Sequence, residues 1–243
     1  MLPLHHAPMA STKRIIALGR AVVKPNFTKN LLTGERVWFT INYMNTRVVI
    51  VNTAGVLPLL SEPGRFASEA RLIECAGADP QRRIQALSAE LALSYALSGD
   101  ELLPPVYSRD EGGRPVIEGG FISLSHTEGF AAAVFSPVPC GIDIEAYRPV
   151  SEAAARRFLC PAELTAPAEP ALARFVIKEA FLKMTGEGVF GGMSRIFETG
   201  GFVFRRGVAR GRCLRLDGKG YFCRLVTREK VEPEVIFYDG GAV

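Results

Sequence analysis

The sequence lacks the cysteine and histidine patterns that mark several common protein classes. Five cysteines are scattered over 243 residues without a C-x-x-C pair, and there are only three histidines. An odd, scattered set of cysteines argues against a disulfide framework, and unpaired cysteines argue against a structural zinc site. We therefore expect reduced thiols in a cytoplasmic protein.

Long apolar runs are also missing. A membrane-spanning helix needs about 20 consecutive apolar residues, and the longest candidate, residues 48–60, is interrupted by Asn52, Thr53 and Pro58. Hydrophobic residues make up 48% of the chain and charged residues 22%, which is typical of globular proteins. We expect a well-developed core and no contact with a membrane.

The positive charge of the chain is concentrated near one end. Residues 1–45 hold six lysines and arginines against one glutamate, whereas the whole chain has a net charge of only +4. The body is therefore close to neutral, which argues against a nucleic-acid-binding surface. We expect residues 1–45 to be a basic extension outside the fold, with Met1 and Met44 as alternative starts. An extra ordered element or a targeting peptide are the alternatives for this segment.

Helical and strand patterns are mixed along the rest of the chain. Helices are predicted over 80–98, 151–158 and 174–184. Strands are predicted over 47–52, 121–124, 131–135 and 141–145, and again over 201–206, 213–216, 221–227 and 234–238. This irregular order favours an α+β fold with mainly antiparallel sheets over a doubly wound parallel sheet.

Two carboxylates lie on one predicted strand. In Gly141-Ile-Asp-Ile-Glu145, the two-residue period of a strand puts Asp143 and Glu145 on one face and the isoleucines on the other. Such a pair is costly beside apolar neighbours unless a cation neutralises it, and Mg²⁺ prefers oxygen ligands of this kind. Solvated acids on an exposed face are the simpler alternative.

A predicted helix and a predicted strand end supply further charged groups. Glu179 and Lys183 are four residues apart and share a helix face, which suits either a third metal ligand with a phosphate-binding lysine or an ordinary surface pair. Ser125 and His126 could donate hydrogen bonds to a phosphate. A Ser–His nucleophile pair is weaker, because neighbours on a strand point to opposite faces and the nucleophile-elbow spacing is absent.

Four motifs occur in one order along the chain, namely Gly113-Arg-Pro115, Ser125-His126, Gly141-Ile-Asp-Ile-Glu145 and Phe175-x-x-Lys-Glu-Ala-x-x-Lys183. In this order they resemble the Sfp-type 4′-phosphopantetheinyl transferase family, whose pattern is G-K/R-P, S-H, G-[IV]-D-[IV]-E and W-x-x-K-E-[AS]-x-x-K. The resemblance extends over about residues 46–240.

The resemblance implies a fold and a reaction. It implies two similar α/β halves, residues 46–140 and 141–243, related by a pseudo-twofold axis, with coenzyme A between them. It also implies Mg²⁺-dependent transfer of the 4′-phosphopantetheine arm to a serine of an apo acyl or peptidyl carrier protein, by a monomer. Adenosine 3′,5′-bisphosphate is the other product. A catalytically silent binding module and an unrelated Mg²⁺ phosphohydrolase are the alternatives.

The resemblance also assigns roles to individual residues. The metal ligands are Asp143, Glu145 and Glu179, and of these Asp143 and Glu179 act in catalysis together with Lys183. Coenzyme A is bound by Arg114, Ser125, His126, Lys178, Lys183 and Arg83. The serine proton would be accepted by Glu179, Glu163 or a metal-bound water.

The chain departs from the family pattern at two positions. Phe175 stands where the family has tryptophan, so any indole hydrogen bond would be lost while the apolar contact remains. Arg71, Arg82 and Arg83 are nearby, but Gln85 stands where arginine is expected, so binding of the 3′-phosphate of coenzyme A would depend more on Arg114 and His126.

Overall fold

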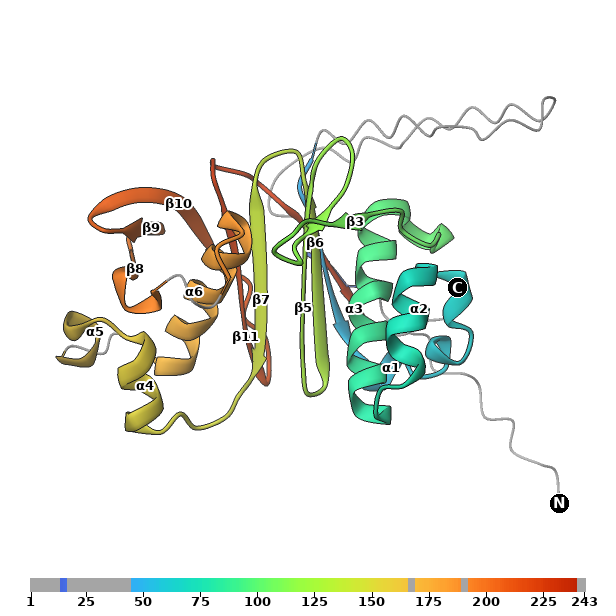
Figure 1. Ribbon diagram of the computed structural model, residues 1–243, viewed down its shortest axis with the longest axis horizontal. Coiled ribbons are helices and arrows are strands. Elements are labelled where there is room, and N and C mark those ends of the chain that lie inside the picture. Colours follow the sequence, from blue (N-terminus) through green and yellow to red (C-terminus); the bar gives the residue numbers. More distant parts are fainter. Residues whose placement is uncertain (1–13, 17–44, 166–168, 189–191, 240–243) are drawn as a thin grey trace, which may run out of the picture.

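The computed structural model describes residues 14–16, 45–165, 169–188 and 192–239, which form two β-sheets packed face to face between two layers of helices (Figure 1). The first sheet has the order β1–β12–β2–β6–β5, with strands β1 (Arg14–Ile16), β12 (Glu234–Tyr238), β2 (Arg47–Asn52), β6 (Phe130–Ser136) and β5 (Phe121–Thr127). All of its pairs are antiparallel except β2–β12.

The second sheet is antiparallel throughout. Its order is β7–β11–β10–β9–β8, with strands β7 (Cys140–Ala146), β11 (Tyr221–Thr227), β10 (Val208–Arg215), β9 (Phe202–Arg205) and β8 (Ile196–Thr199). A small ribbon of β3 (Ser108–Arg109) and β4 (Pro115–Val116) lies above the first sheet. The mixed helices and mainly antiparallel sheets confirm the predicted α+β class.

Helices cover the outer face of each sheet. In Figure 1, α2 (Glu69–Ala76) and α3 (Pro80–Ser98) lie beside the first sheet, and α6 (Ala171–Thr185) lies beside the second. The shorter helices are α1 (Thr53–Val56), α4 (Glu152–Phe158) and α5 (Pro161–Thr165), with single 3₁₀ turns at Leu59–Ser61, Pro63–Arg65, Gly99–Glu101 and Met193–Arg195. Among the described residues, no helix has the length and apolar character needed to cross a bilayer.

Local sequence explains where the long helix α3 begins and what it buries. The Asp79 side chain caps it by accepting a hydrogen bond from the Arg82 amide at 3.0 Å, and Pro80 fills the first position, where no amide donor is needed. From Leu87 to Leu97 every residue is buried. This stretch packs against β2, β5 and β6 and forms the first core.

A second core lies between the sheets and fixes how they meet. Val48 and Ile50 of β2 pack there with Ile142 and Ile144 of β7. The edge strands β5 and β7 consequently run side by side in the centre of the molecule (Figure 1). Polar side chains of β5 and β7 that point away from this core therefore lie close to one another.

The two expected halves correspond only in part to the sheets. The boundary predicted at residue 140 coincides with the first residue of β7, but β12, near the end of the chain, pairs with β2 in the first sheet. Of the expected extension over residues 1–45, residues 14–16 form β1 beside β12, and Met1 and Met44 lie outside the described residues.

Candidate functional site

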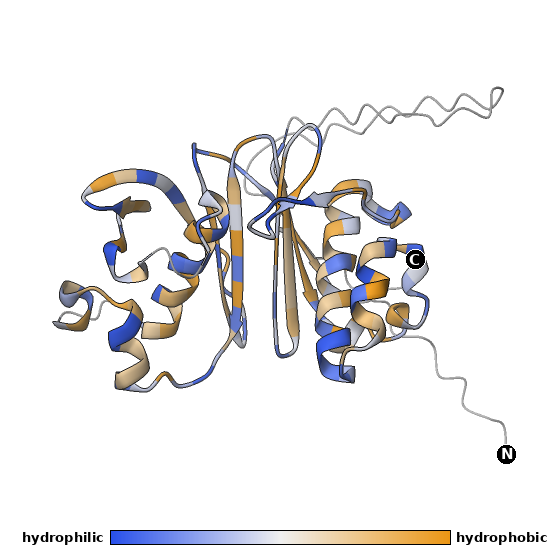
Figure 2. Ribbon diagram, viewed as in Figure 1, coloured by the Kyte–Doolittle hydropathy of each residue, from blue (hydrophilic) through white to orange (hydrophobic). Residues whose placement is uncertain are grey.

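The predicted carboxylates lie on β7 as the strand alternation requires. Ile142 and Ile144 are buried between the sheets, so Asp143 and Glu145 face the opposite side, toward α6. In Figure 2 hydrophilic positions interrupt an otherwise apolar β7. Asp143 is only 5% exposed. These are therefore not solvated acids on an exposed face, and their charge needs a neighbour that offsets it.

Close packing of α6 on β7 brings the helix side chains to these carboxylates. A Cβ atom on Gly141 would lie 2.1 Å from the Ala180 carbonyl oxygen, so only glycine permits this approach of helix and strand. Lys183 Nζ then reaches Asp143 Oδ1 at 2.7 Å. The glycine of the Gly-Ile-Asp-Ile-Glu motif thus sets the spacing on which the site depends.

The neighbouring strand β5 supplies hydroxyl donors to the same carboxylates. Ser125 Oγ donates to Asp143 Oδ1 at 2.7 Å, and Thr127 Oγ1 donates to Glu145 Oε2 at 3.3 Å. His126 lies between them in sequence and therefore points to the other face of β5. The predicted Ser125–His126 pair is thus divided between two sides of the strand, which argues against a Ser–His nucleophile.

The carboxylates of Asp143, Glu145 and Glu179 lie close enough to repel one another. Burial, followed by the negative charge of Asp143, raises the pKa of both Glu145 and Glu179, and Lys183 partly offsets this at Glu179. Two buried oxygens, Asp143 Oδ2 and Glu179 Oε1, have no hydrogen-bond partner among the residues that the structure describes. Unpartnered, mutually repelling carboxylate oxygens fit a hard divalent cation such as Mg²⁺.

A complete ligand cluster is not preformed. Within the described ranges, no three histidine, cysteine, aspartate or glutamate side chains stand close enough around one point to hold a metal ion. The protein therefore offers two unpaired oxygens, with Glu145 nearby and held by Thr127 and Arg148. Magnesium commonly binds to one or two carboxylates and takes its remaining ligands from substrate phosphates and water.

His126 lies on the other face of β5, near two positively charged side chains. Desolvation, followed by the positive charges of Lys183 and Arg71, lowers the pKa of His126. The charges of Lys183 and of Arg71, on α2, both act on His126. The sequence offered Arg71 only as one of three nearby basic residues, and the predicted site kept Arg83 instead, because the position of Arg71 depends on the packing of α2 on α3.

Arg114 lies at the end of α6. Its Nε atom pairs with Asp110 Oδ2 at 3.2 Å in the turn between β3 and β4. A Cβ atom on Gly186, which ends α6 with φ +73°, would lie 3.4 Å from Arg114 Nη1. Arg114 thus lies about one turn beyond Lys183, where a cation also interacts favourably with the helix C-terminus.

Three of the predicted site residues lie elsewhere. Lys178 is 1% exposed and donates to Glu163 Oε2 at 2.6 Å and to the backbone carbonyls of Met193 and Ile196. The structure therefore does not bring Lys178 or Glu163 to the carboxylates. Arg83 is exposed on α3, and its side chain has no hydrogen-bond or ion-pair partner in the part of the chain that is described.

Phe175 retains an apolar contact without a tryptophan. Its ring meets the ring of Phe158 edge to face, with centroids 5.2 Å apart, and anchors α4 to α6. The aromatic position thus has a packing role that phenylalanine can fulfil.

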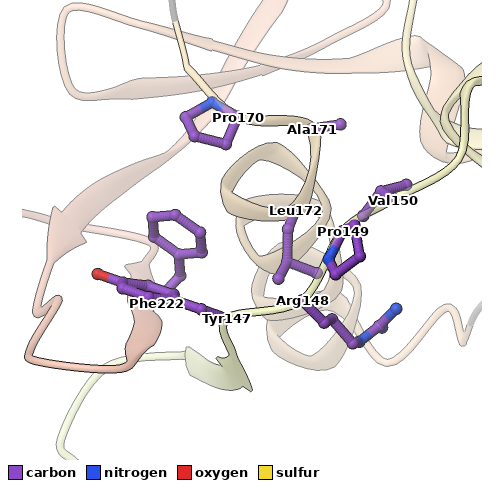
Figure 3. A pocket seen from close by; sticks show the side chains of 8 residues that line it. All are labelled: Tyr147, Arg148, Pro149, Val150, Pro170, Ala171, Leu172 and Phe222. Carbon is purple, nitrogen blue, oxygen red and sulfur yellow. The ribbon is translucent and has the colours of Figure 1, made fainter.

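An apolar groove opens between the segment that follows β7 and the start of α6 (Figure 3). It has a volume of about 460 Å³ and is formed by the segment after β7, the start of α6 and one side chain of β11, with the lining residues Tyr147, Arg148, Pro149, Val150, Pro170, Ala171, Leu172 and Phe222. The Tyr147 and Phe222 rings pack at 4.6 Å between centroids. Because Arg148 also pairs with Glu145, at 3.6 Å, the groove adjoins the site.

Comparison with known proteins finds sequence similarity to one family of transferases. Residues 139–230, which include β7 and α6, match the sequence profile of the 4′-phosphopantetheinyl transferase superfamily. The chain is also 33% identical over 111 residues to the 4′-phosphopantetheinyl transferase psf-1 of Bacillus pumilus. That match spans 41% of this chain and 46%, less than half, of the relative. The family resemblance expected from the four motifs is thereby confirmed.

Proposed function

We propose that this chain, which resembles the 4′-phosphopantetheinyl transferases, transfers the 4′-phosphopantetheine arm of coenzyme A to a serine of an apo acyl or peptidyl carrier protein. The observation that supports this most strongly is the group of Asp143, Glu179 and Lys183 on β7 and α6, with two buried carboxylate oxygens left unpaired.

Asp143 and Glu179 would hold Mg²⁺, with Glu145 as the third carboxylate. When bound, the ion supplies positive charge to the diphosphate of coenzyme A. Lys183, whose side chain is 30% exposed, can contact the diphosphate from the other side while it remains paired with Asp143. Its ammonium would stabilise the negative charge that builds on the leaving group.

The transfer is a displacement at phosphorus. The serine hydroxyl oxygen forms a bond to the β-phosphorus, the bond from that phosphorus to the bridging oxygen breaks, and adenosine 3′,5′-bisphosphate leaves with the electron pair. The serine proton must pass to a base. Glu163 is engaged with Lys178 and Arg174, which leaves Glu179 or a water molecule for this role.

The adenosine end of coenzyme A would lie on the other side of β5. His126 and Arg71 would bind the 3′-phosphate there, and Arg114, which lies beside Gly186, would supply a further positive charge, because a phosphate requires such partners. Ser125 contributes indirectly, because its hydroxyl is already donated to Asp143.

The apolar groove would receive the carrier protein. It is continuous with Glu145 through Arg148, so a protein seated there would hold its serine near the carboxylates. Ala171→Trp fills the groove without adding charge, and we expect it to raise the KM for the carrier about tenfold, or ~1.4 kcal/mol. Val208→Trp, on an exposed strand of the same sheet, is the matched control. An unchanged KM for the carrier in Ala171→Trp would show that the groove does not bind the carrier protein.

The product distinguishes this function from the two alternatives. We expect adenosine 3′,5′-bisphosphate to appear only when coenzyme A, Mg²⁺ and an apo carrier protein are all present, as followed by chromatography. Release without a carrier would indicate a phosphohydrolase. Binding of coenzyme A without release under any condition would indicate a silent binding module.

The proposal also covers the oligomeric state and the location of the protein. We infer that the chain acts as a monomer in the cytoplasm, independently of nucleic acid and membranes. Its near-neutral body and its reduced cysteines support this view. Acyl and peptidyl carriers are both retained as acceptors.

A further inference from the structure

A buried carboxylate on α3 lies outside the site described above. Glu90 is 0% exposed and is surrounded by four donors. It accepts hydrogen bonds from the Ser68 amide at 3.3 Å, Ser68 Oγ at 2.7 Å, Arg71 Nε at 3.3 Å and the Tyr107 hydroxyl at 3.0 Å. These donors come from the start of α2 and the segment before β3, so Glu90 joins three parts of the first half.

Glu90 determines how the Arg71 side chain is held. Arg71 Nε donates to Glu90, one terminal nitrogen donates to Glu74 at 2.6 Å, and the other donates to Tyr107 at 3.4 Å. A guanidinium has five N–H donors, so two remain for a ligand. The Arg71 side chain is still 15% exposed. Helix α2 packs on α3, and α3 packs on the face of β5 that carries Leu124 and, two residues on, His126.

Stability alone is a poor reason for this carboxylate. Burying an ion pair gains little over well-packed apolar residues, because desolvation offsets the attraction. What an apolar residue could not provide is a fixed direction for the guanidinium. Ser68 is also the N-cap of α2, donating to Glu90 while accepting from the Arg71 amide at 3.4 Å. Glu90 therefore controls both the start of α2 and its arginine.

We propose that Glu90 is a positioning residue, which holds Arg71 against the face of β5 that carries His126 so that its free N–H groups bind the 3′-phosphate of coenzyme A. This inference rests on the proposed function, because Arg71 needs a phosphate ligand. Glu90 itself touches no substrate. Its removal should therefore weaken binding of this one phosphate and leave the chemical step unchanged.

Glu90→Gln tests this role, because it keeps the size of the side chain and removes its charge. Charge-assisted hydrogen bonds are about twice as strong as neutral ones. We expect the Kd for coenzyme A, measured by calorimetry, to rise about fivefold. The Kd for dephospho-coenzyme A, which lacks the 3′-phosphate, and the kcat should stay within about twofold. Glu74→Gln removes the exposed partner of the same arginine and is the matched control.

A merely structural role predicts a different pattern. Loosening of the first half would weaken both ligands alike or lower kcat, and either result would overturn the proposal, as would an unchanged Kd for coenzyme A. In an Arg71→Ala background, Glu90→Gln should cause no further loss. If Glu90→Gln does not fold, Tyr107→Phe removes the hydroxyl shared by Glu90 and Arg71, and should weaken coenzyme A binding alone, by about threefold.

The test separates this inference from the proposed function. A wild-type protein that transfers the arm, together with a Glu90→Gln variant that binds coenzyme A normally, would refute only the role of Glu90. A wild-type protein that neither binds coenzyme A nor transfers the arm would refute both.

Discussion

Replacing Asp143 with alanine is expected to lower the transfer rate by about 10³-fold or more and to leave the protein folded. The substitution removes one of two unpaired carboxylate oxygens and also the anion that holds Lys183 Nζ at 2.7 Å. Loss of a single preorganised charge-stabilising group typically costs about 10²–10³ in rate. Here two such groups, the metal ligand and the lysine, are disturbed at once.

The fold should tolerate this change because Asp143 lies in a repulsive cluster. Its charge raises the pKa of both Glu145 and Glu179, so its removal relieves repulsion as well as breaking hydrogen bonds. Lys183 is partly exposed and can be solvated once its partner is gone. The denaturant midpoint and the rate should be measured on one preparation, with Glu152→Ala, an exposed carboxylate on α4, as control. A near wild-type rate with Mg²⁺ would show that the metal assignment is wrong.

Lys178→Met is expected to have the opposite profile, lowering the free energy of unfolding by about 3–5 kcal/mol. Removing one partner of a buried ion pair is strongly destabilising, and Arg174, 3.4 Å from Glu163, compensates the charge of that carboxylate only in part. Lys178 is 1% exposed and Glu163 is 8% exposed, and the lysine also donates to the backbone carbonyls of Met193, in the turn before β8, and Ile196, the first residue of β8. The lost contacts hold α5, α6 and that turn together.

Lys183→Met, five residues along the same helix, is the matched control. It should lower the unfolding free energy less than Lys178→Met does, because the Lys183 side chain is 30% exposed whereas Lys178 is 1% exposed, although it leaves the buried Asp143 without its cation. It should lower the transfer rate strongly. The folded fraction of Lys178→Met should keep most of its activity. Chemical denaturation and initial rates test both variants. If the Lys178→Met protein has wild-type stability but no activity, Lys178 binds a phosphate of the substrate and its structural role is wrong.

The different fates of these lysines could in part have been predicted from sequence. Side chains five residues apart on a helix point about 140° away from each other, whereas Glu179 and Lys183, four apart, share a face. A helix that presents Glu179 and Lys183 to β7 must therefore turn Lys178 away. The resemblance to the family placed both lysines at the substrate, and helix geometry separates them.

The two-residue alternation of the strands predicted the positions of the carboxylates, whereas nothing in the sequence predicted how the helices of the first half pack. The alternation in Gly141 to Glu145 was sufficient to put Asp143 and Glu145 on one face, and the same period separates Ser125 from His126. Arg71 and Glu90 carried no such signal, because their meeting depends on the packing of α2 on α3. The pairing of β12 with β2 joins segments almost 190 residues apart, which local periodicity cannot detect.

Intact-protein mass spectrometry of an apo carrier protein, incubated with this chain, coenzyme A and Mg²⁺, tests the central claim most directly. The account predicts a mass increase of one 4′-phosphopantetheine arm on the carrier serine, lost when EDTA is added and lost with Asp143→Ala. No mass increase on either acyl or peptidyl carriers, from a folded protein that still binds coenzyme A, would contradict it.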